Sequence, residues 1–306
     1  MDRAPNLPPP LEYLPFTAAP FRLALGLTAL RPEDWIEIDA HYPRDLKLKR
    51  ELLAQRHGEV FAALPGSAEP SREALELLAR HLTERFPDWF EQSHGVLENK
   101  LTGECWDLTG DAHHPLDLAA RWVQEDLCLM QARGSEYVLT AASVAFPSRW
   151  SLNEKLGRPM QAIHAPVAHY KEQLGETADR FMERLSADKP VWRLNWNIHD
   201  SGEPFQPRGP GGVAPDPRIT PENAGQKLFF RVERQTLRRL PDSGAILFTI
   251  RTYIRPLADF EQRPECAARL AAALRNYPPE TFRYKNQGVF AGAALAWLDR
   301  AARPGG

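Results

Sequence analysis

The chain of 306 residues has only three cysteines, at positions 105, 128 and 266. An odd number at such wide spacing fits neither a disulfide framework nor a CxxC metal or iron–sulfur pattern, so we expect reduced thiols. Charge of one sign is not in excess either, because 38 Lys and Arg residues stand against 40 Asp and Glu residues and the net charge is -2. A chain without a basic field does not collect phosphate backbones, and nucleic acid is therefore not an expected partner.

Long apolar runs are also missing. No uninterrupted run reaches the roughly 18 residues that a membrane helix needs, and the N-terminus has neither a basic n-region nor an apolar h-region. We therefore predict a cytoplasmic protein with no membrane span. Nucleotide-binding and hydrolase motifs are absent as well, since there is no GxGxxG after a strand, no Walker A sequence and no GxSxG.

Proline content and hydrophobic periodicity divide the chain into four parts. Residues 1–20 hold six prolines, too many for a helix, and predict an extended arm. Residues 21–125 follow a helical pattern and predict a helical N-terminal region, with Ser71 as the N-cap of one helix. Residues 126–262 alternate between strand and helix patterns, and residues 263–306 predict C-terminal helices.

The third part carries five predicted strands, of which the one at 228–240 departs from the period-2 alternation. These predicted strands are residues 127–132, 137–146, 191–199, 228–240 and 245–254. Short helices are expected at 151–189, including a longer one at about 167–185, and a long loop at 201–226. This order predicts an α+β fold: a PAS-like five-stranded antiparallel sheet with a concave ligand pocket, on which the helical N-terminal and C-terminal extensions pack.

The predicted strand 228–240 carries charge on both of its faces. Arg231 and Glu233 point one way and Arg234 points the other. Buried charges need partners, so one face is expected to look into a polar cavity. Arg251 and Tyr253 of the next strand would extend an anion-binding or catalytic surface. The alternative is an internal salt-bridge network between the sheet and the N-terminal helices.

None of the nine histidines belongs to an HExxH pair or to a cluster with zinc-ligand spacing. A conventional protein-bound metal site is therefore not predicted, but a haem needs only one protein ligand. His164 is the first candidate, because its neighbours are apolar and Pro166 stiffens the turn that follows. His169 and His199 are further candidates. A lone histidine is also commonly a core or capping residue, and this alternative stays open.

Several segments together resemble one known family. They are Phe146-Pro-Ser-Arg149-Trp150, Lys155-Leu-Gly157, Ile163-His164-Ala-Pro166-Val167, Asn195-Trp196 and the run from Arg231 to Tyr253. Over about residues 20–300 the chain is similar to the haem-dependent oxidative N-demethylase alpha subunit family. The resemblance implies a PAS-like domain that binds haem b and acts as a monooxygenase: O2 oxidises a methyl group of a small secondary amine such as dimethylamine, and formaldehyde is released.

The resemblance also implies partners, since the electrons would come from NADPH through separate flavin and iron–sulfur subunits. It makes His164 the expected iron ligand, with His199 as the alternative. An arginine on the distal side of the haem is implied as well, and either Arg231 or Arg234 occupies the matching strand. Glu233 would hold the positive charge of the amine or orient that arginine.

Arg149, Arg251 and Tyr253 complete the expected haem-binding set. Two other functions remain open for the same residues. The chain would be a non-catalytic haem-binding module of the PAS type that senses a gas or redox state, or a structural subunit without haem.

Overall fold

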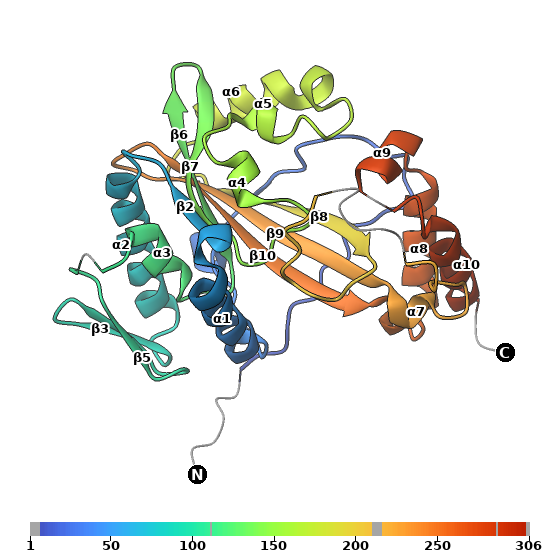
Figure 1. Cartoon of the computed structure of the whole chain (residues 1–306), viewed down its shortest axis with the longest axis horizontal. Coiled ribbons are helices and arrows are strands. Elements are labelled where there is room, and N and C mark those ends of the chain that lie inside the picture. Colours follow the sequence, from blue (N-terminus) through green and yellow to red (C-terminus); the bar gives the residue numbers. More distant parts are fainter. Residues whose placement is uncertain (1–6, 111, 210–215, 286, 304–306) are drawn as a thin grey trace, which may run out of the picture.

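The computed structural model describes residues 7–110, 112–209, 216–285 and 287–303. Its centre is an antiparallel sheet of seven strands in the order β1-β8-β9-β10-β6-β7-β2 (Figure 1). These strands are β1 (Thr28–Ala29), β2 (Phe61–Ala63), β6 (Asp126–Arg133), β7 (Glu136–Ser143), β8 (Val191–His199), β9 (Phe229–Arg239) and β10 (Ile246–Pro256). A separate three-stranded sheet consists of β3 (Phe90–Ser93), β4 (Val96–Asn99) and β5 (Glu104–Asp107).

All five predicted strands are present, as β6 to β10. The number of strands in the sheet was predicted wrongly, because β1 and β2 extend it at its two edges. β1 has two residues and β2 has three, and segments this short show no period-2 pattern. The α+β class is confirmed, whereas the PAS-like character of the sheet stays a prediction.

Glycines allow the two tight turns of the sheet. Gly134 lies between β6 and β7 with φ +65°, and Gly244 lies between β9 and β10 with φ +69°. Residues with a side chain rarely adopt a positive φ, so glycine is favoured at both places. Both turns lie where the sequence predicts them.

The helices depart from the predicted boundaries in several places. In the N-terminal region they are η1 (Pro32–Asp34), α1 (Tyr42–Val60), α2 (Ala68–Arg85) and α3 (Pro115–Ala120). α2 begins at Ala68, so Ser71 lies inside the helix and the N-cap assignment was wrong. This region also holds the three-stranded sheet, whose four-residue strands were too short to be predicted.

Short helices follow β7: α4 (Leu152–Lys155), α5 (Met160–Ile163), the π-helix η2 (Lys171–Gly175) and α6 (Glu176–Arg184). The helix expected over about 167–185 is thus divided, and its first residues form turns. The C-terminal part contains α7 (Ala224–Lys227), η3 (Leu257–Phe260), α8 (Pro264–Arg275), α9 (Pro279–Tyr284) and α10 (Ala291–Ala301). In the predicted loop, residues 201–209 and 216–223 have no regular structure, and 210–215 lie outside the described residues.

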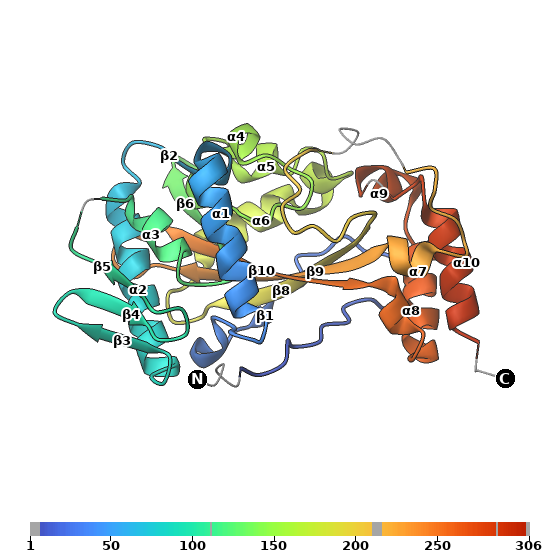
Figure 2. The ribbon, with the colours of Figure 1, turned by 60° about the horizontal axis from the view of Figure 1, so that its bottom comes forward.

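The large sheet separates two layers. α4, α5 and α6 cover one face, and the N-terminal arm crosses the other (Figure 2). We call these the α5 face and the arm face. Met160 and Ile163 of α5 pack against a core cluster that contains Leu237 of β9, which places Leu237 on the α5 face. Odd-numbered residues of β9 therefore point to the α5 face, and even-numbered ones point to the arm face.

Residues 7–20 have no helix or strand and are held on the arm face by specific contacts. Phe16 is 1% exposed and packs edge-on against Phe230. Glu12 forms ion pairs with Arg255 and Arg263. The start of the chain is thus part of the packed body over these residues. In the part of the chain that the structure describes, no helix combines the length and apolar character needed to cross a bilayer.

Candidate functional site

The predicted site residues fall into three separate groups. Arg231 and Glu233 lie on the α5 face, the same face on which α5 ends at His164. Arg234 is an even-numbered residue of β9 and lies on the arm face, as does Arg251, its partner in the antiparallel register. Tyr253 shares the arm face with Arg251. Arg149 and His199 form the third group, at the end of β8: His199 is the last residue of this strand and pairs with Phe229 of β9, so it also lies on the α5 face.

His164 is the C-cap residue of α5 and is held by its own helix. Its Nδ1 lies 2.9 Å from the carbonyl oxygen of Met160, and its ring stacks on Tyr170 with 4.6 Å between ring centroids. Burial lowers the pKa of His164 to about 4, so the imidazole is neutral at neutral pH. A neutral ring must donate from Nδ1 to a carbonyl, which leaves the lone pair on Nε2. Nε2 has no hydrogen-bond partner among the described residues.

Glu233 is surrounded by hydrogen-bond donors. The amides of Asn195 and Gln235 lie 3.3 Å and 3.0 Å from its Oε2, and Nε of Arg231 lies 3.5 Å from its Oε1. Arg231 itself is 1% exposed and donates to the carbonyls of Phe146 and Pro204, so it is anchored as well as charged. Burial lowers its pKa. This carboxylate is fixed in position by donors from β8 and β9.

Further cations lie around Glu233 on the α5 face. Arg193 is opposite Gln235 in the register, and its buried Nε has no hydrogen-bond partner in the described part of the chain. Burial lowers the pKa of Arg193, of Lys155 and of Lys285, the last to about 8, and the charge of Glu233 acts against all three shifts. Positive charge is therefore in excess in this cluster, and an anionic group would complete it.

His199 has a different environment from His164. Its Nδ1 lies 2.9 Å from Oε1 of Gln206, whose amide nitrogen is oriented by two backbone carbonyls, and its Nε2 lies 3.2 Å from Oγ of Ser148. Arg149 is next to this ring and forms an ion pair with Asp200. Burial lowers the pKa of His199 to about 3, and the side chain is 1% exposed. Both ring nitrogens are thus already used within the protein.

Arg251 belongs to a buried ion-pair network. Its guanidinium lies 2.6 Å from Oδ2 of Asp39 and 3.3 Å from Oδ2 of Asp45, which is part of α1. It also lies over the ring of Tyr253, 4.6 Å from the ring centroid. Two interpretations of Arg251 were open from the sequence: a ligand-binding surface, or an internal salt bridge to the N-terminal helices. The structure has the salt bridge.

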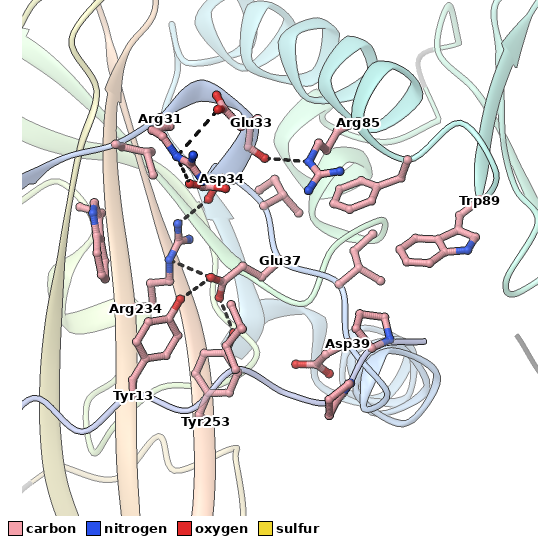
Figure 3. A pocket seen from close by; sticks show the side chains of 18 of the residues that line it. Tyr13, Arg31, Glu33, Asp34, Glu37, Asp39, Arg85, Trp89, Arg234 and Tyr253 are labelled. Carbon is pink, nitrogen blue, oxygen red and sulfur yellow. Dashed lines mark hydrogen bonds and ion pairs between the residues drawn. The ribbon is translucent and has the colours of Figure 1, made fainter. Parts of the chain in front are cut away.

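A cavity of about 800 Å³ opens on the arm face, and Glu37 lies at its floor (Figure 3). The hydroxyl of Tyr13 donates to Oε1 of Glu37 at 2.5 Å, the hydroxyl of Tyr253 donates to Oε2, and Nε of Arg234 lies 3.1 Å from Oε1. Burial, together with the charge of Glu37, raises the pKa of Tyr13, so its hydroxyl keeps its proton. Among the described residues, no histidine or cysteine lines this cavity.

The sequence analysis did not find Glu37 and Tyr13. Tyr13 lies in the proline-rich arm, and Glu37 lies in an irregular segment after η1, so neither has a periodic pattern around it. A buried acid near them was missed too. Glu125 accepts a hydrogen bond from the backbone N–H of Glu37 at 3.0 Å, and burial raises its pKa to about 7.

Within the described residues, no three His, Cys, Asp or Glu side chains come together as a metal-binding group. The α5 face instead offers one neutral imidazole beside a cationic cluster, an arrangement typical of proteins that hold an anionic prosthetic group through a single histidine. A family model described as "Haem-dependent oxidative N-demethylase, alpha subunit-like" matches residues 26–295. The chain belongs to this family.

The residues of the α5 face fit a haem. His164 presents an Nε2 lone pair, and the hydrogen bond from its Nδ1 to a backbone carbonyl is the support that a metal-bound imidazole usually has. Arg193 has a buried Nε without a partner and matches the carboxylates that haem carries. The cavity on the arm face fits less well, because its two tyrosines are both bound as donors to Glu37.

Proposed function

We propose that this protein removes a methyl group from a small secondary amine such as dimethylamine, with O2 and externally supplied electrons, and releases formaldehyde. The proposed site is the α5 face, with His164 as the ligand of haem b. Haem supplies the oxidising chemistry when it is bound. The observation that carries the proposal is the neutral imidazole of His164, anchored at Nδ1 and without a partner at Nε2 among the described residues, in a chain of a haem-dependent family.

His164 is favoured over His199 as the iron ligand. To bind a metal through Nε2, His199 would have to give up its contact with Ser148. It would also have to become exposed from a fully buried position. His164 can bind a metal through Nε2 and keep its hydrogen bond at Nδ1. Because its pKa is lowered to about 4, protons do not compete with the metal above about pH 4.

Cationic side chains would hold the carboxylates of the haem. Arg193 is the first of these, since its Nε has no partner. Lys155 is the second: it donates to the carbonyl of Ile163, next to His164, at 3.1 Å, and so lies beside the proposed ligand. Pairing with carboxylates would offset the cost of burying both cations.

Glu233 would bind the substrate amine. Secondary alkylamines are cationic at neutral pH, and a carboxylate fixed by Asn195 and Gln235 would accept an N–H from the ammonium group. Arg231 lies next to this carboxylate and, of the two candidate arginines Arg231 and Arg234, is the one on the side of His164. We assign it the role of the distal donor, which stabilises negative charge that develops on oxygen.

Reduction would come from other subunits, as the alpha subunit-like family name implies. We propose that NADPH supplies the electrons through flavin and iron–sulfur proteins.

The test uses the full chain reconstituted with haem. A Soret band at a stoichiometry of one haem per chain is expected, and reduction in the presence of O2 and dimethylamine should yield formaldehyde. Trimethylamine and methylamine serve as comparison substrates. A chain that binds haem but forms no formaldehyde from any of these amines with a competent reductase would reject the enzymatic function, and the absence of a Soret band would reject the haem site.

A further inference from the structure

The cavity on the arm face is built from four separate segments. The arm contributes Tyr13, the segment after η1 contributes Glu37, the sheet contributes Trp192 and Arg234, and the end of α2 contributes Arg85 and its neighbours. Ligand pockets typically have volumes of about 300 to 1,000 Å³ and combine apolar walls with a few fixed polar groups. This cavity, of about 800 Å³, has both features and lies on the opposite side of the sheet from His164.

The polar floor of the cavity is already satisfied. Glu37 accepts from Tyr13, Tyr253 and Arg234 (Figure 3). Arg234 also donates to the carbonyls of Asp34 and Trp35. These groups are rigid and need no partner from a ligand, so recognition must come from the walls and the rim.

Two walls of the cavity are aromatic. Phe86 and Trp89 stack on each other at the end of α2, with 5.4 Å between ring centroids and 11° between their planes. Trp192 of β8 belongs to a different wall and is held by Arg234, whose guanidinium lies 5.4 Å from its ring centroid. Aromatic rings in the lining favour a flat aromatic ligand, because stacking adds to the gain from burying apolar area.

Charge at the rim selects the sign of the ligand. Arg85 lies over the ring of Phe86 and donates to the carbonyl of Glu33 at 3.1 Å, and among the described residues it forms no ion pair with a carboxylate. The lining carboxylates Asp34 and Asp39 are paired with Arg31 and Arg251. Glu37 is paired with Arg234, and Glu33 lies 3.8 Å from Arg31. Asp88 is exposed and forms no ion pair among the described residues. An anionic group on the ligand would therefore pair with Arg85.

We propose that this cavity is a binding site for a flat aromatic molecule, of about two fused rings, that carries one anionic group. The rings stack on the Phe86–Trp89 pair, and the anionic group pairs with Arg85, which lies beside that pair. The site is separate from the proposed haem site and does not depend on it.

Isothermal titration calorimetry of the full chain tests this proposal with 2-naphthoate as the probe. Its cationic counterpart, 2-naphthylmethylamine, and acetate are the comparison ligands. We expect one naphthoate per chain, at least about tenfold weaker binding of the amine, and no binding of acetate. Equal binding of both naphthyl compounds, or no heat from naphthoate at millimolar concentration, would overturn the proposal.

Variants at the rim locate the site. Arg85→Gln should weaken naphthoate binding about three- to fivefold, as expected for one exposed ion pair, and Arg85→Glu should reverse the preference toward the amine. Arg80→Gln, an exposed arginine on the same helix but outside the lining, is the matched control and should change nothing. Trp89→Ala should weaken binding about tenfold. Naphthoate binding that is unchanged in Arg85→Glu would place the ligand elsewhere and contradict the proposal, even if Trp89→Ala failed to fold.

Discussion

Arg231 and Arg234 lie three positions apart on β9 and point to opposite faces of the sheet. Arg231 lies 3.5 Å from Glu233 on the α5 face, and Arg234 lies 3.1 Å from Glu37 on the arm face. Each arginine thus serves a different carboxylate. One strand thus places charge on both faces of the sheet, which explains why neither face of this strand is apolar in the sequence.

The two arginines should therefore differ in their effect on turnover. In haem-reconstituted protein, Arg231→Ala should retain the haem but lower the rate of formaldehyde formation on the order of 10² to 10³, as when an oxyanion donor is removed. Arg234→Ala is the matched control, because it removes an equally buried guanidinium from the other face. Rates are measured per bound haem, so that loss of stability does not count as loss of catalysis. Equal losses in both variants would contradict the assignment of Arg231.

Replacing the histidines one at a time should identify the iron ligand. His164→Ala should abolish or greatly weaken haem binding, seen as loss of the Soret band on reconstitution, because both ring nitrogens of His199, the alternative ligand, are already in contact with Gln206 and Ser148. His169→Ala is the control five positions later, where the side chain is largely exposed. A normal spectrum for His164→Ala combined with haem loss for His199→Ala would move the ligand to His199.

Most of the sheet could be predicted from the sequence, and the reason lies in the strands themselves. The segment 191–199 alternates along its whole length, and β8 has the same boundaries. β9 and β10 have eleven residues each and are joined by a turn with glycine at a positive φ. Their length and the turn residues between them make these strands recognisable, even in β9, where charged residues interrupt the alternation. β1 and β2 are too short to show a pattern.

The candidate site could be predicted only in part, because sequence does not place side chains on a shared face across distant segments. Alternation separates Arg231 from Arg234, but it does not say which of them faces His164. Arg251 was expected to bind a cofactor, and its partners Asp39 and Asp45 lie more than 200 positions away in the chain. Pairings of this kind depend on the tertiary fold.

The buried pair of Arg251 and Asp45 should be important for stability. Asp45→Asn keeps the shape of the side chain but leaves Arg251, which is 1% exposed, with Asp39 as its remaining carboxylate. Breaking a buried ion pair from one side typically costs about 3 kcal/mol or more. Urea denaturation should show this loss, whereas Glu51→Gln, in an exposed pair on the same helix, should lie within about 0.5 kcal/mol of the unaltered protein. Similar midpoints for both variants would contradict the buried network.

Glu125 should make the protein less stable as the pH rises. Burial raises its pKa from 4.5 to about 7, so the folded state keeps the proton over a range in which the unfolded state has released it. Below pH 4.5 Glu125 is protonated in both states, so it does not change the free energy of unfolding as the pH varies. Between pH 4.5 and 7 the folded state binds more protons, so the contribution of Glu125 to the free energy of unfolding falls, and above pH 7 it is constant.

Glu125→Gln removes this titration and keeps an oxygen that accepts from the backbone N–H of Glu37. The free energy of unfolding of the variant minus that of the unaltered protein should therefore grow between pH 5 and pH 8, by roughly 3 kcal/mol, which is the equivalent of the shift in pKa. Only the change of this difference with pH is diagnostic. The side-chain NH2 of the introduced glutamine also needs a hydrogen-bond partner, but it does not titrate, so its cost is the same at every pH. Glu98→Gln, at an exposed position of β4, should show no such change. A difference that is flat across this range, or that shrinks with pH, would mean that Glu125 is ionised in the folded protein at pH 5.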